Sequence, residues 1–130
     1  MRRSRLPVSG AIFGLLILLG LMVGCGSSGR SYPLNQELAR SSVQTAMQAW
    51  VDGKSPKDLK GFKPAIIIGD TGWEKGKKLV SFEILTNEET SDGSNLHIRV
   101  KRKFSGEGGD SESKVIYIVG TTPVITIFPQ

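Results

Sequence analysis

The apolar residues that follow Asn35 recur at helical spacing. They form one stripe along a helix, made of Ala39, Val43, Ala46, Met47, Trp50 and Val51. The opposite side is polar and carries Gln36, Arg40, Gln44 and Gln48. This pattern predicts an amphipathic helix that packs on a core along one side. Pro33 and Asn35 suit its start, and Gly53 suits its C-terminal cap.

Beyond the helix the pattern changes to runs rich in β-branched and aromatic residues, at 63–68, 79–86, 96–104, 114–119 and 124–128. Turn-forming residues separate these runs, which predicts five strands. Alternation in the third run puts Leu96, Ile98, Val100 and Phe104 on one side and His97, Arg99, Lys101 and Lys103 on the other. Arg102 is the one charged residue on the apolar side. In the second run we expect the inward residues to be Val80, Phe82 and Ile84.

The order of these elements predicts the fold class. No second helix of useful length is expected between the runs, and parallel strands need such a crossover. We therefore expect an α+β domain in which one N-terminal helix packs on an antiparallel, four- to five-stranded meander sheet. The run 115–119 is apolar on both sides, which favours a central strand or partial cover by a loop. This element order resembles the cystatin-like and NTF2-like layouts.

The first residues have the three-part pattern of an export signal. Basic residues at Arg2, Arg3 and Arg5 precede an apolar stretch at 11–23, which is shorter than the about 20 residues a spanning helix needs. Leu21-Met22-Val23-Gly24-Cys25 then resembles the bacterial lipobox, with Met22 where that motif usually has Leu. The resemblance implies cleavage after residue 24 and acylation of Cys25 on sulfur. We expect a signal peptide at 1–24, a lipidated tether at 25–32 and one domain at 33–130.

The resemblance to a lipobox also determines the expected location. It implies an exported lipoprotein that is anchored to a membrane of the cell envelope by a lipid on Cys25. Gly26 stands where such lipoproteins carry an Asp for inner-membrane retention, which favours the outer membrane. The rest of the chain resembles uncharacterised small bacterial lipoproteins that end in a "YIVGTTPVITIF"-type strand pair, a resemblance that implies a fold and no activity. Three of the 17 Lys and Arg leave with the signal while 12 Asp and Glu remain, so the net charge falls from +5 to +2.

One motif carries a possible chemistry. Asp70-Thr71-Gly72 follows apolar residues and resembles the active-site loop of aspartic proteases. Catalysis by these enzymes needs two carboxylates, so a chain with a single motif must form a dimer to supply the second. Trp73 stands where that family has Ala or Ser, and the elements that follow differ from the family's. We therefore expect a turn between strands, with an Asp70 hydrolase as the least favoured alternative.

Basic residues mark the candidate binding site. The turn before the second run and the loop after the third meet at one end of a meander, where Lys75, Lys77 and Lys78 would approach Lys103. Such a cluster suits anionic lipid, cell-wall polymer or an acidic protein surface. The alternative is a solvated surface whose charge is balanced by Glu74, Glu107, Asp110 and Glu112. Trp73 is either an exposed binding anchor or packed over a sheet edge, and we favour packing.

Other chemistries find little support in the sequence. His97 is the only histidine and Cys25 the only cysteine, so no catalytic triad, metal site or cofactor is predicted. Aromatic residues are not interleaved with the basic run, which argues against nucleic acid. We expect a non-catalytic, membrane-anchored binding or assembly domain, with an envelope protein as partner or, alternatively, an anionic polymer or lipid. The sequence leaves the partner and the oligomeric state open.

Overall fold

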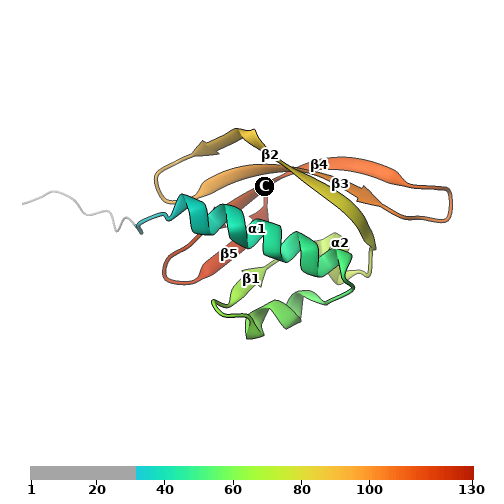
Figure 1. The fold of residues 1–130 in the computed structure, drawn as a ribbon, viewed down its shortest axis with the longest axis horizontal. Helices are drawn as coiled ribbons and strands as arrows, with labels where there is room; N and C mark the ends of the chain where they lie inside the picture. The colour runs from blue at the N-terminus through green and yellow to red at the C-terminus, as the bar shows by residue number, and fades with distance from the viewer. Residues whose placement is uncertain (1–31) are drawn as a thin grey trace, which may run out of the picture. The chain divides into compact units, whose positions relative to one another are not determined.

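The computed structural model describes residues 32–130, and the predicted signal peptide and Cys25 lie outside them. The described part is an α+β domain with one sheet (Figure 1). Its helical elements are α1 (Gln36–Val51), the 3₁₀ helix η2 (Pro56–Gly61) and the one-turn α2 (Thr71–Glu74). The strands are β1 (Ile66–Ile68), β2 (Leu79–Ser91), β3 (Leu96–Phe104), β4 (Ser111–Gly120) and β5 (Ile125–Pro129).

The sheet is mixed, with the strand order β1-β5-β4-β3-β2. Neighbouring strands are antiparallel except β1 and β5, which run parallel. The prediction of a purely antiparallel meander is therefore wrong at β1. The connection through α2 leads the chain from β1 at one edge of the sheet to β2 at the other (Figure 1). The parallel pair β1–β5 needs no crossover helix because β2, β3 and β4 connect the two strands, so the lack of a long second helix did not exclude it.

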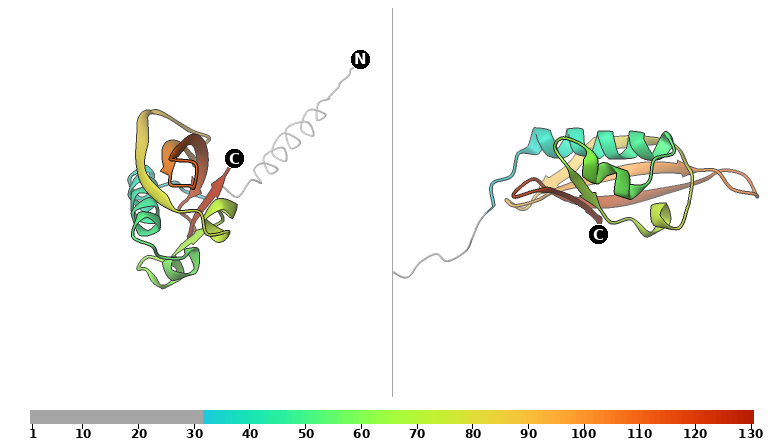
Figure 2. Two further views of the ribbon diagram at one scale, coloured as in Figure 1. Left: turned by 90° about the vertical axis from the view of Figure 1, so that its right-hand side faces the viewer. Right: turned by 90° about the horizontal axis from the view of Figure 1, so that it is seen from below.

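Local capping determines where α1 begins and ends. The Asn35 side chain accepts a hydrogen bond from the backbone N–H of Leu38 at 3.0 Å, which satisfies a free donor of the first turn. Gly53, at φ +87°, ends the helix and donates to the carbonyl of Trp50. The apolar stripe between these caps packs into the core, and α1 lies along one face of the sheet (Figure 2). We call the opposite face the outer face.

Alternation along the strands orients the core. In β3 the prediction is confirmed, because Leu96, Ile98, Val100 and Phe104 are buried. In β2 it is wrong for Val80, which is exposed. A register shift between Leu79 and Ser81 buries Leu79 instead, while Phe82 and Ile84 are half-buried against the core. β4 lies between β3 and β5, so its expected interior position is confirmed.

Hydrogen bonds join different segments at the two ends of the domain. At the N-terminal end, Thr121 Oγ1 accepts from the backbone N–H of Asn35 at 2.9 Å, and Thr122 Oγ1 donates to the carbonyl of Pro33 at 2.9 Å. These bonds join the start of α1 to the β4–β5 turn. At the other end, the backbone N–H of Ser105 donates to the carbonyl of Lys78 at 3.2 Å. The start of β2, the end of β3 and the end of α1 meet there.

Candidate functional site

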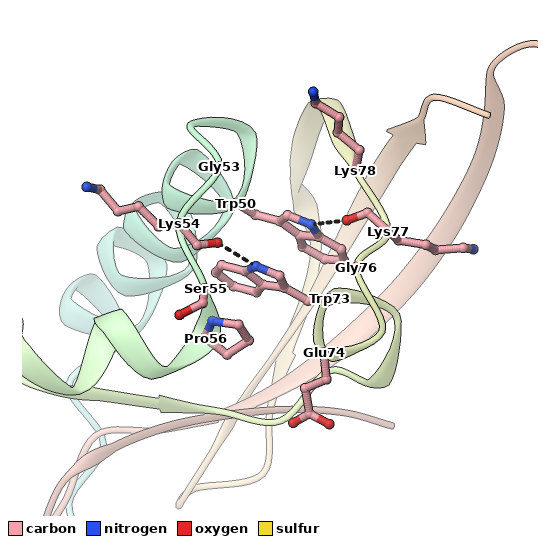
Figure 3. Close-up of a pocket in the computed structure, with 10 residues that line it drawn as sticks. All are labelled: Trp50, Gly53, Lys54, Ser55, Pro56, Trp73, Glu74, Gly76, Lys77 and Lys78. Atoms are coloured by element: carbon pink, nitrogen blue, oxygen red, sulfur yellow. Dashed lines mark hydrogen bonds between the residues drawn. The ribbon is translucent and has the colours of Figure 1, made fainter. Parts of the chain in front are cut away.

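Two stacked tryptophans form the centre of the candidate site at the C-terminal end of α1. The rings of Trp50, from the last turn of α1, and Trp73, from α2, have centroids 4.9 Å apart and planes only 2° from parallel (Figure 3). They are 3% and 5% exposed. Trp73 thus packs on another aromatic ring, not over a sheet edge as expected. The stack fastens α2 to the end of α1.

Both ring nitrogens donate hydrogen bonds to lysine carbonyls. Trp50 Nε1 donates to the backbone oxygen of Lys77, and Trp73 Nε1 donates to that of Lys54, each at 2.8 Å (Figure 3). A buried indole N–H needs such a partner, and here the partners belong to exposed basic residues. The stack therefore holds the backbone of Lys54 and Lys77 in place.

A cavity of about 330 Å³ lies beside the stack. Its lining includes both tryptophans, the segment 53–56, three lysines and one carboxylate, Glu74. We call the three lysines, Lys54, Lys77 and Lys78, the lysine end. Their ammonium groups point in different directions away from the tryptophan pair (Figure 3). Lys77 Nζ also lies 4.7 Å from the centroid of the Phe104 ring, a cation–π contact.

The structure brings together only part of the predicted basic cluster. Lys77, Lys78 and Trp73 line the cavity, while Lys75 caps the C-terminus of α2 and is exposed outside it. Lys103 does not approach them. It alternates with the buried Phe104, so it lies on the outer face, where Lys101, Glu83 and Glu112 surround it. Lys54 was not among the predicted binding residues, although its place just after the Gly53 cap was a usable signal.

A second polar cluster is buried between α2 and the sheet. Asp70 is 4% exposed; its Oδ2 accepts from the Tyr117 hydroxyl at 2.6 Å and from Arg102 at 3.1 Å. Its Oδ1 caps α2 by accepting from the backbone N–H groups of Gly72 and Trp73. Arg102 also donates to Ser113 at 3.2 Å. Burial, and next the charge of Asp70, raises the pKa of the Tyr117 hydroxyl well above its usual value.

This cluster explains the Asp-Thr-Gly motif. Both carboxylate oxygens of Asp70 are engaged, one in the helix cap and one in the bonds to Arg102 and Tyr117. A protease carboxylate must share a proton with its partner near a water molecule, which this arrangement does not favour. Asp70 therefore serves the fold, and the expected simple turn is a capped helical turn. Arg102 enters the apolar side of β3 because Asp70 compensates its charge.

His97 has a local partner. Its Nε2 lies 3.0 Å from Asp92 Oδ2, beside the β2–β3 turn. This bond, followed by bonds from the backbone of Asn95 and Ser94, lowers the pKa of Asp92. Within residues 32–130 no three His, Cys, Asp or Glu side chains gather as they would around a metal ion.

Comparison with known proteins identifies no relative. No protein-family model, no curated protein and no solved structure matches the chain. Over the described range, no helix is both long and apolar enough to cross a membrane. The function must therefore be argued from the geometry of the domain.

Proposed function

We propose that this chain is an exported lipoprotein of the cell envelope, anchored through an acylated Cys25, whose domain is a non-catalytic binding module. Its binding site is the lysine end, and its ligand is an extended anionic polymer. The observation that carries the proposal is the cavity beside the Trp50–Trp73 stack with its border of three lysines. The lipobox-like segment supports the anchor, and the packing around the cavity supports the site.

The site is built to hold its charges in place. The two indole N–H groups are bonded to the backbone of Lys54 and Lys77, two of the three lysines that border the cavity. A surface whose backbone is already ordered loses less conformational entropy when a ligand binds. Lysines on an ordinary solvated surface have no such support, and this difference favours a binding function for Lys54 and Lys77.

The arrangement favours a long ligand over a small one. Lys54, Lys77 and Lys78 diverge (Figure 3), so one phosphate-sized ion would not contact all three. A polymer with anionic groups spaced along its length would. Glu74 is the single carboxylate in the lining, so the local charge is positive although the net charge of the mature chain is small. The tryptophan rings are stacked and buried, so they offer no exposed platform for a sugar ring.

Retention on a polyphosphate matrix tests the site. The full acylated chain, solubilised in detergent, is eluted with salt and compared with a triple variant, Lys54→Ser, Lys77→Ser and Lys78→Ser. The matched control, Lys101→Ser, Lys103→Ser and Lys114→Ser, removes the same charge from the outer face. We expect the lysine-end variant to elute at much lower salt than the wild type and the control to elute near it.

Equal losses of retention in both triple variants would show that binding depends on net charge alone and would contradict the proposed site.

The anchor is tested separately by Cys25→Ser in cells. The proposal expects the precursor to remain uncleaved and unacylated, whereas the wild type is cleaved and carries lipid. Processing that is the same in both chains would contradict the lipoprotein assignment.

A further inference from the structure

Apolar side chains gather on the outer face of the sheet over β1, β5 and β4. Ile67 and Phe128 are exposed there, at 38% and 45%. Phe128 pairs in register with Ile118, and Thr126, two residues before it, pairs with Ile67. Val124, in the bend just before β5, is also exposed. We call these side chains, with the half-buried Ile116, the apolar patch: Ile67, Ile116, Ile118, Val124 and Phe128.

The patch lies toward the N-terminal end of the domain. Val124 adjoins the β4–β5 turn, whose Thr121 and Thr122 are bonded to Asn35 and Pro33 at the start of α1. Farther along the same face the side chains become charged. Lys101 pairs in register with Lys114, and Lys103 pairs with Glu112. Over β1, β5 and β4 the outer face is thus apolar near the point where the domain begins, and His97 and Arg99 of β3 border the patch beside Ile118 and Ile116.

We propose that the apolar patch rests on the lipid bilayer that holds Cys25. The inference depends on the proposed anchor. The seven residues from Gly26 to Tyr32 span at most about 25 Å when fully extended. This short tether keeps the N-terminal end of the domain, and with it the patch, close to the membrane surface.

The chemistry of the patch suits that surface. Aliphatic side chains with an aromatic residue among them partition into the headgroup boundary, where apolar faces insert about 5–10 Å. Tyr32, also exposed, lies at the same end. A second copy of the chain is a less economical occupant, because the tether brings the patch to lipid without an encounter between proteins.

This orientation assigns the two ends of the domain different roles. The backbone of Lys54 and Lys77 is bonded to the tryptophan pair at the end of α1, and α1 lies on the face of the sheet opposite the patch. With the patch on the bilayer, the lysine end is therefore on the side of the sheet that faces away from the membrane. The anionic groups it meets then belong to a polymer of the envelope space and not to lipid headgroups.

Site-specific quenching in vesicles tests the orientation. Acylation occupies the sulfur of Cys25, so an engineered cysteine carries the only free thiol. The full acylated chain is placed in vesicles of phosphatidylethanolamine and phosphatidylglycerol, with an environment-sensitive fluorophore on Val124→Cys or on Val80→Cys. These valines are similarly exposed, at 38% and 43%, but Val80 lies beside Gln44 and Gln48 of α1. A lipid-borne nitroxide reports proximity to the bilayer, and aqueous iodide reports exposure to water.

We expect the nitroxide to quench the label at position 124 at least about threefold more strongly than the label at position 80, because an inserted face lies within reach of the lipid. Phe128→Cys gives a second position with the same expectation. Equal quenching at positions 80 and 124 would overturn the proposal. So would a label at position 124 that is shielded from iodide but not quenched by lipid, since a protein partner would then cover the patch.

The proposed anchor is tested separately, because processing of Cys25→Ser that matches the wild type would contradict it. The proposed polymer site is tested by retention on polyphosphate. Each of the three proposals can therefore fail without the other two.

Discussion

Replacing Asp70 by asparagine should destabilise the domain strongly. Asparagine keeps one oxygen to cap α2 but removes the charge that faces Arg102, whose side chain is only 15% exposed. Breaking a buried ion pair on one side costs about 3–5 kcal/mol, and the partial exposure of Arg102 favours the lower figure of about 3 kcal/mol. A domain of this size has roughly 5–15 kcal/mol of total stability, so the loss would be a large share of it.

Urea unfolding followed by tryptophan fluorescence measures this loss, because both tryptophans are buried in the fold. In thermal melting, a loss of about 3 kcal/mol corresponds to roughly 12–24 °C. The double variant Asp70→Asn, Arg102→Met should recover about 1–3 kcal/mol relative to the sum of the two single changes, since the unpaired charge is gone. A loss below about 1 kcal/mol, or strict additivity, would refute the ion-pair reasoning.

Two further predictions concern Tyr117 and Gly53. Because the pKa of Tyr117 is raised in the folded domain, the unfolded chain loses this proton at a lower pH than the folded one, and the free energy of unfolding should fall above about pH 10. Tyr117→Phe should remove this alkaline fall in the urea midpoint. A fall that is unchanged in the variant would contradict the assignment. Gly53→Ala should lower stability by about 1–2 kcal/mol because alanine resists a positive φ. Thermal melting measures this loss. Gly61→Ala is the control, because an added Cβ at position 61 meets open space and the backbone there has no positive φ. Equal melting temperatures of the two variants would contradict the prediction.

The elements with a regular period were predictable from the sequence. The helical stripe that ends at Trp50 and the alternation of β3 each repeat over several turns or residue pairs, and their burial follows the pattern. The prediction for Val80 was wrong because a register shift inverts the alternation, and no residue in the β2 sequence marks that shift. The parallel pairing of β1 with β5 was missed because only three residues carry it.

The candidate site was predictable only in part. Arg102 stood out as a charge on the apolar side of β3, yet its partner Asp70 lies 32 residues away and no local pattern connects the two. Likewise the stack of Trp50 on Trp73 depends on how α2 meets α1. Alternation already placed Lys103 on the polar side of β3, so its separation from Lys77 could have been anticipated.

The binding of a polyanion at the lysine end can be measured by tryptophan emission, because Trp50 and Trp73 line the same cavity as the lysines. The full acylated chain is titrated with linear polyphosphate at two salt concentrations, beside the lysine-end triple variant and orthophosphate at equal phosphate concentration. We expect a saturable emission change with polyphosphate that salt weakens, and no change with orthophosphate or in the triple variant. An equal change in the triple variant would contradict the proposed site.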